Sequence, residues 1–234
     1  MNWINKVAVN WFKRRYKQLR RDYRNPKQIQ LEWFQRLLDH AQNTEWGLKY
    51  KYQNISNPKQ YAETVPVSDY QQLFPYIQRI RKGEANVLWP GVTKWFSKSS
   101  GTTEQKSKFI PVTVEALKEC HFKGGKDMLA IYSNNNPHTS IFFGHSISMG
   151  GSLHKNELSK NSYYGDLSAI IIKNLPVWVQ AIRSPRKSIA LMDDWENKIE
   201  RMALATVNKN ITSIIGVPSW NLILMKRILE ISGK

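Results

Sequence analysis

The opening of the chain alternates apolar and polar positions with the period of an α-helix. Between residues 2 and 24, apolar side chains recur every three or four positions, which predicts an amphipathic helix. The expected buried face consists of Ile4, Ala8, Phe12, Tyr16, Leu19 and Tyr23, with Trp11 beside it. Asn25-Pro26 is expected to end this helix, because the residue before a proline disfavours helical geometry. A second helix is predicted at about 27–43, with Trp33, Leu37 and Ala41 on one stripe and Phe34 and Leu38 beside them.

The pattern changes after this helical opening. Residues 52–68 are rich in Asn, Ser and Pro, and this composition predicts a connector. Ser68-Asp69 is then expected to cap a short helix that reaches about Arg81. Residues 92–96 and 108–112 are apolar runs typical of strands, and a polar loop of small residues separates them.

Helices and strands continue to alternate in the second half. Thr113 is expected to cap a helix over 114–130, and Thr139–Ser148 is predicted to be a strand that Gly150-Gly151 ends. Asp193-Asp194 is expected to cap a helix, an interpretation favoured over metal binding by this acidic pair. The apolar face of that helix consists of Trp195, Ile199, Met202, Ala203 and Thr206.

The last segment predicts a short buried strand at Ile211–Ile215 and a strongly apolar closing helix from about Ser219 to Ile231. Alternating helices and strands from residue 92 onward indicate the α/β class, with a helical segment at the amino terminus. Residues 1–50 are expected to form a basic amphipathic helical segment that packs on a main α/β domain over 51–234. The apolar closing helix is expected to require more protein to cover it.

Composition narrows the class of protein. The 234 residues are 41% hydrophobic, include nine Trp and carry a net charge of +17, so a disordered chain is excluded. One cysteine, Cys120, excludes a disulfide scaffold and is compatible with a reducing cytosol, so we expect a cytoplasmic protein. No apolar stretch reaches the roughly 18 residues of a membrane span. Val7–Val9 is also too short for the apolar core of a signal peptide.

The positive charge indicates an anionic partner such as nucleic acid, a membrane surface or a phosphorylated small molecule. The first thirty residues contain nine Lys or Arg and one Asp, which gives +8. A helix with a solvated basic face, docked on the main domain, is the favoured interpretation. The alternative is a module that binds anionic lipid or nucleic acid through this helix.

The most informative segment is the polar loop between the two predicted strands. Four hydroxyls surround a glycine, and two lysines follow; the residues are Ser99, Ser100, Gly101, Thr102, Thr103, Lys106 and Lys108. Such a loop suits a phosphate chain, because the glycine lets backbone amides turn inward, hydroxyls donate to phosphate oxygens and lysine supplies charge. The alternative is an ordinary polar hairpin loop. A Walker loop is excluded, because Gly125-Lys126 is followed by Asp127 and has Cys120 in place of the first glycine.

This loop resembles the first nucleotide-binding motif of adenylate-forming enzymes, in particular the auxin-responsive acyl acid–amido synthetase family and its bacterial relatives. In that family the motif has the sequence Ser-Ser-Gly-Thr-Ser/Thr, followed by a lysine and then a proline, which here is Pro111. Further similar blocks are Gly-Asp-Leu-Ser-Ala at 165–169, Asn-Leu-Pro at 174–176, the helical block at 194–201 and Ile-Thr-Ser-Ile-Ile-Gly-Val-Pro-Ser-Trp at 211–220. Order and spacing agree over about 30–230, nearly the whole chain.

The resemblance implies the amino-terminal part of the large domain of the luciferase-like adenylate-forming fold. It also implies ATP- and Mg²⁺-dependent activation of a small carboxylic acid through an acyl-adenylate, followed by transfer to an acceptor such as an amino acid. Catalysis would then come from positioning and charge stabilisation. ATP is the anionic partner expected on this basis, and nucleic acid is not.

The same resemblance implies roles for individual residues. Ser99, Ser100, Thr102 and Thr103, with the Gly101 amide, would cradle the phosphates, and Lys108 would neutralise the leaving pyrophosphate, with Lys106 as substitute. The acyl or nucleotide pocket would be bordered by Val217, Pro218, Ser219 and Trp220, and its acyl side lined by Met149, Gly150 and Gly151. The alternatives are a solvated loop lysine for Lys108 and simple core packing for Trp220.

Two departures from the family pattern qualify this expectation. Gln105 stands where the family often has glycine, which predicts a stiffer or differently shaped loop. The second and third family motifs and the small carboxy-terminal domain are absent from the 234 residues, which predicts a fragment that is inactive alone or an inactive remnant.

Other constellations are disfavoured. The five histidines show no metal-binding spacing, and Cys120-His121 has no second pair to complete a zinc site. Gly144-His145-Ser146-Ile147-Ser148 lacks the last glycine of a serine-hydrolase elbow.

Overall fold

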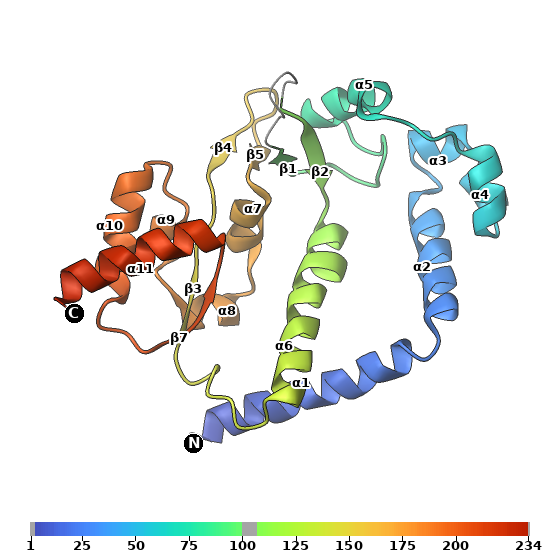
Figure 1. Ribbon diagram of the computed structural model, residues 1–234. Helices are drawn as coiled ribbons and strands as arrows, with labels where there is room; N and C mark the ends of the chain where they lie inside the picture. Colours follow the sequence, from blue (N-terminus) through green and yellow to red (C-terminus); the bar gives the residue numbers. More distant parts are fainter. Residues whose placement is uncertain (1–2, 100–106, 234) are drawn as a thin grey trace. The chain divides into compact units, whose positions relative to one another are not determined.

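The computed structural model describes residues 3–99 and 107–233 (Figure 1). The chain forms two compact units, each assembled from separate stretches of sequence. Unit 1 comprises Met1–Lys17, Glu115–His154 and Gly165–Lys234, and unit 2 comprises Gln18–Val114 and Lys155–Tyr164. Within the described ranges, no helix is both long and apolar enough to cross a membrane.

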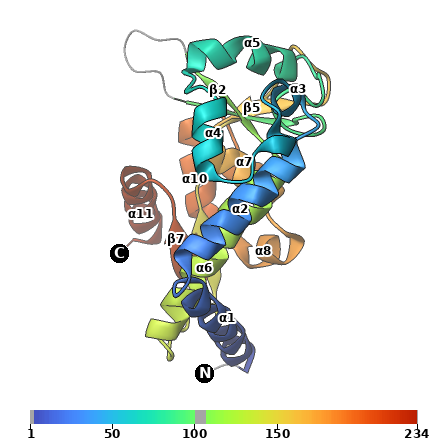
Figure 2. The ribbon, with the colours of Figure 1, turned by 90° about the vertical axis from the view of Figure 1, so that its right-hand side faces the viewer.

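Unit 2 begins with a group of helices (Figure 2), whose side chains form an apolar cluster. Its elements are α2 (Pro26–Ala41), α3 (Glu45–Lys49), η1 (Tyr52–Asn54) and α4 (Pro58–Thr64). Their buried cluster contains Leu38, Ala41, Tyr52, Ile55 and Val65. The predicted stripe on α2 is wrong at Leu37, which is 48% exposed, because the helix buries the Leu38–Ala41 side instead.

The connector expected at 52–68 is also wrong, because it contains η1 and α4. Asn57 caps α4 by accepting a hydrogen bond from the Gln60 amide at 3.0 Å, and Pro58 occupies the first turn. An Asn-Pro pair suits this position, since proline tolerates the first turn of a helix and asparagine satisfies an otherwise unpaired amide. The segment buries Tyr52, Ile55 and Val65 rather than merely linking two elements.

Helix α5 (Tyr70–Arg81) confirms the predicted cap. The Asp69 carboxylate accepts from the Gln72 amide at 2.8 Å, and the Gln72 side chain accepts from the Asp69 amide at 2.9 Å. This reciprocal capping box fixes where the helix begins.

Strands β1 (Trp95–Lys98) and β2 (Phe109–Val112) follow α5 and pair antiparallel, with Trp95 opposite Val112 and Lys98 opposite Phe109. The sheet is completed by β4 (Leu153–Lys155) and β5 (Tyr163–Gly165), in the order β2-β1-β5-β4. Phe96 is fully buried against Ile80 and Val87, which joins α5 to the sheet in one core.

Unit 1 contains a parallel sheet of three strands in the order β6-β3-β7. The strands are β3 (His145–Ser148), β6 (Arg183–Ser184) and β7 (Ile211–Ile215). The predicted strand at 139–148 is thus restricted to its last four residues. Strand β7 has the predicted bounds, but its expected burial is wrong: Ile214 is 39% and Ile215 is 54% exposed, because β7 lies at the edge of the sheet.

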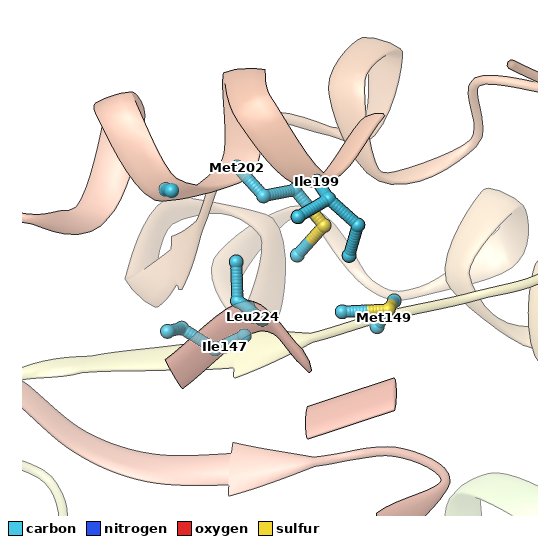
Figure 3. Packing of buried hydrophobic residues seen from close by; sticks show 6 residues of the cluster. Ile147, Met149, Ile199, Met202 and Leu224 are labelled. Carbon is cyan, nitrogen blue, oxygen red and sulfur yellow. The ribbon is translucent and has the colours of Figure 1, made fainter. Parts of the chain in front are cut away.

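Five helices of unit 1 follow β3 along the chain. They are α7 (Leu167–Asn174), α8 (Val177–Ile182), α9 (Lys187–Ala190), α10 (Trp195–Thr206) and α11 (Pro218–Ser232). The core of unit 1 joins β3 to α10 and α11 through Ile147, Met149, Ile199, Met202 and Leu224 (Figure 3). Asp194 caps α10 by accepting from the Asn197 amide at 3.1 Å, which confirms the predicted cap.

The predicted closing helix is confirmed as α11, and much of its apolar surface is exposed. Leu224 is its one buried residue. Leu222, Ile223, Met225 and Leu229 are 39% to 65% exposed. Arg227 holds α11 to α10 by a two-fold hydrogen bond to the Glu200 carboxylate, at 2.6 and 3.1 Å.

Helix α1 (Trp3–Asp22) starts in unit 1 and confirms the predicted amphipathic helix. Its buried face runs through Asn5, Val9 and Phe12, and the Phe12 ring stacks on Phe142 at 5.0 Å. The predicted face is wrong at Tyr23, which is 66% exposed beyond the end of the helix; the side chain of Ile4 lies outside the described part of the chain.

Helix α6 (Lys123–Asn135) provides the partner of α1 in unit 1. A π-helical segment, Ala116–Phe122, precedes it, and the predicted helix over 114–130 therefore continues five residues further. Asn5 also anchors α1, because its Nδ2 donates to the Thr139 carbonyl at 2.7 Å and its Oδ1 accepts from the Phe142 amide at 3.2 Å.

The ion pair between Arg15 and Asp127 gives a first testable prediction. Arg15 Nε and Nη2 donate to the two Asp127 carboxylate oxygens at 2.6 and 3.0 Å, with side chains only 11% and 21% exposed. We expect Asp127→Asn to lower the free energy of unfolding by about 1–3 kcal/mol, because it removes one charged, shielded acceptor. Urea unfolding followed by circular dichroism measures this. The control, Glu63→Gln, removes the exposed partner of Lys59 and should change little; equal effects would contradict the prediction.

Candidate functional site

The β1–β2 hairpin closes at Ser99 and Lys108, one residue beyond β1 and one before β2. The Ser99 amide donates to the Lys108 carbonyl at 2.9 Å, and the Lys108 amide donates to Ser99 Oγ at 3.3 Å. The backbone bond extends the antiparallel ladder by one pair, and both bonds hold Ser99 beside Lys108. The predicted phosphate-binding residues Ser100, Gly101, Thr102, Thr103 and Lys106, together with Gln105, lie outside the described residues.

Helix α5 supports the base of this loop. The Tyr70 hydroxyl, in the first turn of the helix, accepts a hydrogen bond from the Phe109 amide at 2.9 Å. The half-buried Lys108 places its ammonium 5.4 Å from the centre of the Tyr70 ring, within the range of a cation–π contact. With the described residues Lys108 forms no salt bridge, so its charge is not neutralised by a carboxylate there.

In unit 1, the two predicted pocket segments lie together at the carboxyl edge of the parallel sheet. Met149, Gly150 and Gly151 directly follow β3, and Val217–Trp220 follow β7 after one glycine. The strands run parallel side by side, and the Met149 amide donates to the Ile215 carbonyl at 3.2 Å. Open parallel sheets bind their ligands outside the carboxyl ends of the strands, so both segments occupy a typical position for a site.

The turn after β3 packs tightly against the first turn of α7. The Gly151 amide donates to Ser168 Oγ at 3.1 Å, and the Ser152 amide donates to the Asp166 carboxylate at 2.9 Å. A methyl group on Gly151 would lie 1.9 Å from Asp166 Oδ2, and one on Gly150 would lie 2.7 Å from Ile172 Cδ1. Gly151 is therefore required sterically, whereas at Gly150 the flexible end of Ile172 could move aside.

Two buried cations support this edge, and neither was predicted. Lys198 on α10 is 3% exposed, and its ammonium donates to the Gly150 carbonyl at 3.0 Å. Arg183 on β6 is 6% exposed, and its Nε and Nη2 donate to Ser148 Oγ at 2.5 Å and to the Ser148 carbonyl at 3.2 Å. Burial lowers the pKa of both side chains, although the carboxylates of Asp193 and Asp166 partly oppose this for Lys198.

A signal for Lys198 exists in the sequence. In helical projection it lies at the border of the apolar stripe of α10, next to Met202 and one turn after Trp195. A long aliphatic stem with a polar end at such a position indicates a buried lysine that reaches a backbone acceptor. No comparable signal marks Arg183, which follows a short helix.

The segment after β7 forms the exposed start of α11. Val217 is 45% exposed, and Pro218 and Ser219 are exposed as well. Trp220 is half-buried and packs against Trp195, with ring centroids 5.1 Å apart. The contact is the core packing considered as the alternative for this residue, and it leaves the three preceding residues available to a ligand.

The opposite edge of the same sheet has a cavity of about 440 Å³. Phe142, His145, Ile182, Lys209 and Asn210 are among the residues that line it. None of the predicted pocket residues lies there, so the cavity and the carboxyl-edge segments are different places in unit 1.

In the described part of the chain, no group of three or more His, Cys, Asp or Glu side chains could hold a metal ion.

Comparison with known proteins identifies relatives. A stretch of 95 residues is 34% identical to jasmonoyl-L-amino acid synthetase JAR6 of Nicotiana attenuata. This match covers 38% of this chain and 16% of that protein. A stretch of 95 residues is 32% identical to indole-3-acetic acid-amido synthetase GH3.2 of Arabidopsis thaliana. This match covers 40% of this chain and 17% of that protein. The matched stretches thus span about a sixth of these relatives.

The fold extends the similarity over nearly the whole chain. The solved structure of GH3.15 acyl acid amido synthetase matches 93% of this chain and 38% of its own chain, with a TM-score of 0.73 and 20% sequence identity. This match confirms the expected α/β fold with a helical amino-terminal segment. A family model described as the GH3 family N-terminal domain matches residues 15–234. The chain therefore belongs to the GH3 family.

Proposed function

We propose that this chain is the phosphate- and acyl-binding part of an enzyme that activates a carboxylic acid with ATP and transfers it to an amine acceptor such as an amino acid. The names of two relatives describe synthetases that act on jasmonoyl and indole-3-acetic acid groups. Because the chain matches only part of those proteins, the complete reaction is assigned to a protein that includes this chain and the remaining family motifs.

The observation that carries the proposal is the closure of the β1–β2 hairpin at Ser99 and Lys108. Between these two residues the sequence places Ser100, Thr102 and Thr103 around Gly101, and two strands and Tyr70 hold the described residues on either side. Hydroxyl donors and a lysine without a carboxylate partner among the described residues are the donor set that a polyphosphate needs. In this assignment Ser99 and Lys108 hold the ends of the loop, and the Lys108 ammonium meets the charge that develops on pyrophosphate.

ATP and Mg²⁺ enter the proposal together. Mg²⁺ usually keeps several waters and binds through substrate phosphates with one or two carboxylates, so the nucleotide itself would bring the ion. The chain would contribute positioning and electrostatic stabilisation of the phosphates.

The carboxyl edge of the unit 1 sheet supports an acyl site. We assign the acyl side to Met149, Gly150 and Gly151 and the pocket border to Val217, Pro218, Ser219 and Trp220. The backbone of the first segment is held by Lys198 and Ser168, so its shape is fixed before any ligand binds.

ATP–pyrophosphate exchange tests the proposal. It is measured on the protein translated from the whole reading frame that contains this chain, and ATP and pyrophosphate binding is measured by calorimetry on the 234-residue chain. We expect Ser100→Ala with Lys108→Ala to lower exchange by about 100-fold or more, since electrostatic donors of this kind contribute two to three orders of magnitude. Binding of pyrophosphate to the chain should fall in parallel.

The control is Ser68→Ala with Lys82→Ala, which removes a half-buried serine and an exposed lysine from the same unit. Its exchange rate should match that of the unchanged protein. Unaltered exchange in the Ser100/Lys108 variant would show that the loop does not bind the phosphates. A reading frame that stops at Lys234, with no exchange, would indicate an inactive remnant.

A further inference from the structure

The outward face of α1 presents large apolar side chains to solvent. Trp3, Val7 and Trp11 are 72%, 58% and 45% exposed. They are four positions apart, so they form one stripe along the first half of the helix. Exposed apolar stripes of this kind, when they are surrounded by polar groups, mark interaction surfaces.

The inward face of the same helix is already occupied. Val9 and Phe12 are each 3% exposed, and the Arg15–Asp127 pair holds the helix to α6. The Trp3–Val7–Trp11 stripe is therefore a second apolar surface, on the side that the described part of unit 1 does not cover. Docking through one face leaves the other available for a partner.

Cations surround the stripe. In helical projection Arg14 lies between Trp3 and Val7, and Lys6 and Lys17 lie beside them; all three are exposed. Exposed Lys126 of α6 adds a further charge, with its ammonium 4.5 Å from the centre of the Trp11 ring. The one acidic residue of α1 is Asp22, in its last turn, so the stripe lies in a field of positive charge.

We propose that this face of α1 docks on an anionic phospholipid surface. Indole rings and an aliphatic side chain between lysines and arginines match the boundary between lipid headgroups and acyl chains. A nucleic-acid backbone would use the cations but would leave Val7 and Trp3 in water, so the stripe favours lipid. The matched region of the family begins at residue 15, and the apolar stripe precedes it.

A single short stripe supports weak, reversible binding. Each lysine or arginine near an anionic bilayer should contribute about fivefold in affinity, and the contribution should fall as salt rises. The acyl-activation chemistry proposed above does not depend on this contact, so the two proposals can fail separately.

Vesicle flotation of the whole chain tests the inference. The vesicles contain phosphatidylcholine alone or with about 30% phosphatidylserine, a composition chosen to give the surface potential of an anionic leaflet. We expect binding to the anionic vesicles only. Trp3→Ser with Val7→Ser should weaken it by about tenfold or more, because both side chains insert into the interface.

The matched control removes the same two residue types from another exposed site. Val177 and Trp178 are 86% and 59% exposed on α8, and Val177→Ser with Trp178→Ser should leave binding unchanged. Lys6→Gln with Arg14→Gln and Lys17→Gln should lower binding and reduce its salt dependence. Circular dichroism confirms that each variant keeps its helices.

A reporter locates the contact. In a Cys120→Ser background, Val7→Cys labelled with an environment-sensitive dye should shift its emission to the blue on anionic vesicles, and Val177→Cys should not. Several results would overturn the inference. The first two are an absence of vesicle binding and vesicle binding that does not depend on Trp3 and Val7. The third is stronger retention by an RNA or DNA oligomer than by vesicles. The fourth is a dimer, observed in sedimentation, that the Trp3→Ser/Val7→Ser variant no longer forms.

Discussion

Replacing Lys198 with alanine is expected to lower the free energy of unfolding by about 3–5 kcal/mol, because the change opens a cavity and leaves the Gly150 carbonyl unpaired. The lysine is 3% exposed, and its ammonium lies 3.0 Å from that carbonyl. It belongs to α10, whose Ile199 and Met202 pack in one core with Met149 (Figure 3). The variant should therefore lose both stability and the fixed shape of the turn after β3.

A conservative variant separates the two effects. Lys198→Met keeps most of the side-chain volume but donates no hydrogen bond, so it should cost about 1–3 kcal/mol, the penalty of one unsatisfied buried carbonyl. Urea unfolding by circular dichroism should rank the unchanged chain above Lys198→Met and Lys198→Met above Lys198→Ala. A methionine variant as stable as the unchanged chain would show that the carbonyl contact contributes nothing.

The pH dependence of the same pair gives an independent measurement. Burial lowers the pKa of Lys198 below its ordinary value, so the folded chain releases this proton at lower pH than the unfolded chain. Between the two pKa values the unfolded state binds more protons, and stability rises with pH. The advantage over Lys198→Met should therefore grow as the pH rises toward about 10, near the ordinary lysine value. A constant difference would mean that Lys198 titrates normally.

Local signals in the sequence predicted several elements well. The Asp69 and Asp194 caps were visible because a carboxylate at the first position of a helix satisfies amides of the next turn, whatever the rest of the fold does. Strand β7 was placed at its observed bounds because apolar β-branched residues end there at glycine and proline. In each case the information lies within a few residues.

Other features depend on tertiary contacts and could not be read in the same way. Leu37 and Leu38 are equally apolar, and only packing against Tyr52 and Ile55 decides that Leu38 is buried. Asn5 lies on the buried face of α1 because Thr139 and Phe142, more than 130 residues away, supply its hydrogen bonds. The buried Arg183 likewise acquires its acceptors from a neighbouring strand.

The candidate site also contains residues that the sequence predicted and residues that only the fold reveals. Pattern and resemblance located Met149–Gly151 and Val217–Trp220 in the sequence, and the parallel pairing of β3 with β7 places both at one edge. The supporting residues Lys198 and Asp166 come from α10 and from the start of α7, and their contacts with the glycine turn follow only from the fold.

Replacing Gly151 with alanine is the second large effect, with an expected loss of about 3 kcal/mol or more from overpacking. The new methyl group would lie 1.9, 2.3 and 2.7 Å from Oδ2, Cγ and Cβ of Asp166. Rotation of the Asp166 side chain could move the carboxylate but not Cβ, so the backbone of the turn or of α7 must shift. That shift would break the hydrogen bonds from the Gly151 and Ser152 amides.

The matched control is Gly125→Ala on α6, where a methyl group meets no atom within 4 Å. In a helix interior this change should stabilise by about 0.5–1 kcal/mol, since alanine loses less backbone entropy than glycine. Thermal unfolding should therefore move in opposite directions for the two variants. If Gly151→Ala unfolds like the unchanged chain, the turn is more open than its contacts indicate, and it cannot present a fixed surface to an acyl group. If it unfolds early while Gly125→Ala does not, the loss comes from steric closure of this one turn.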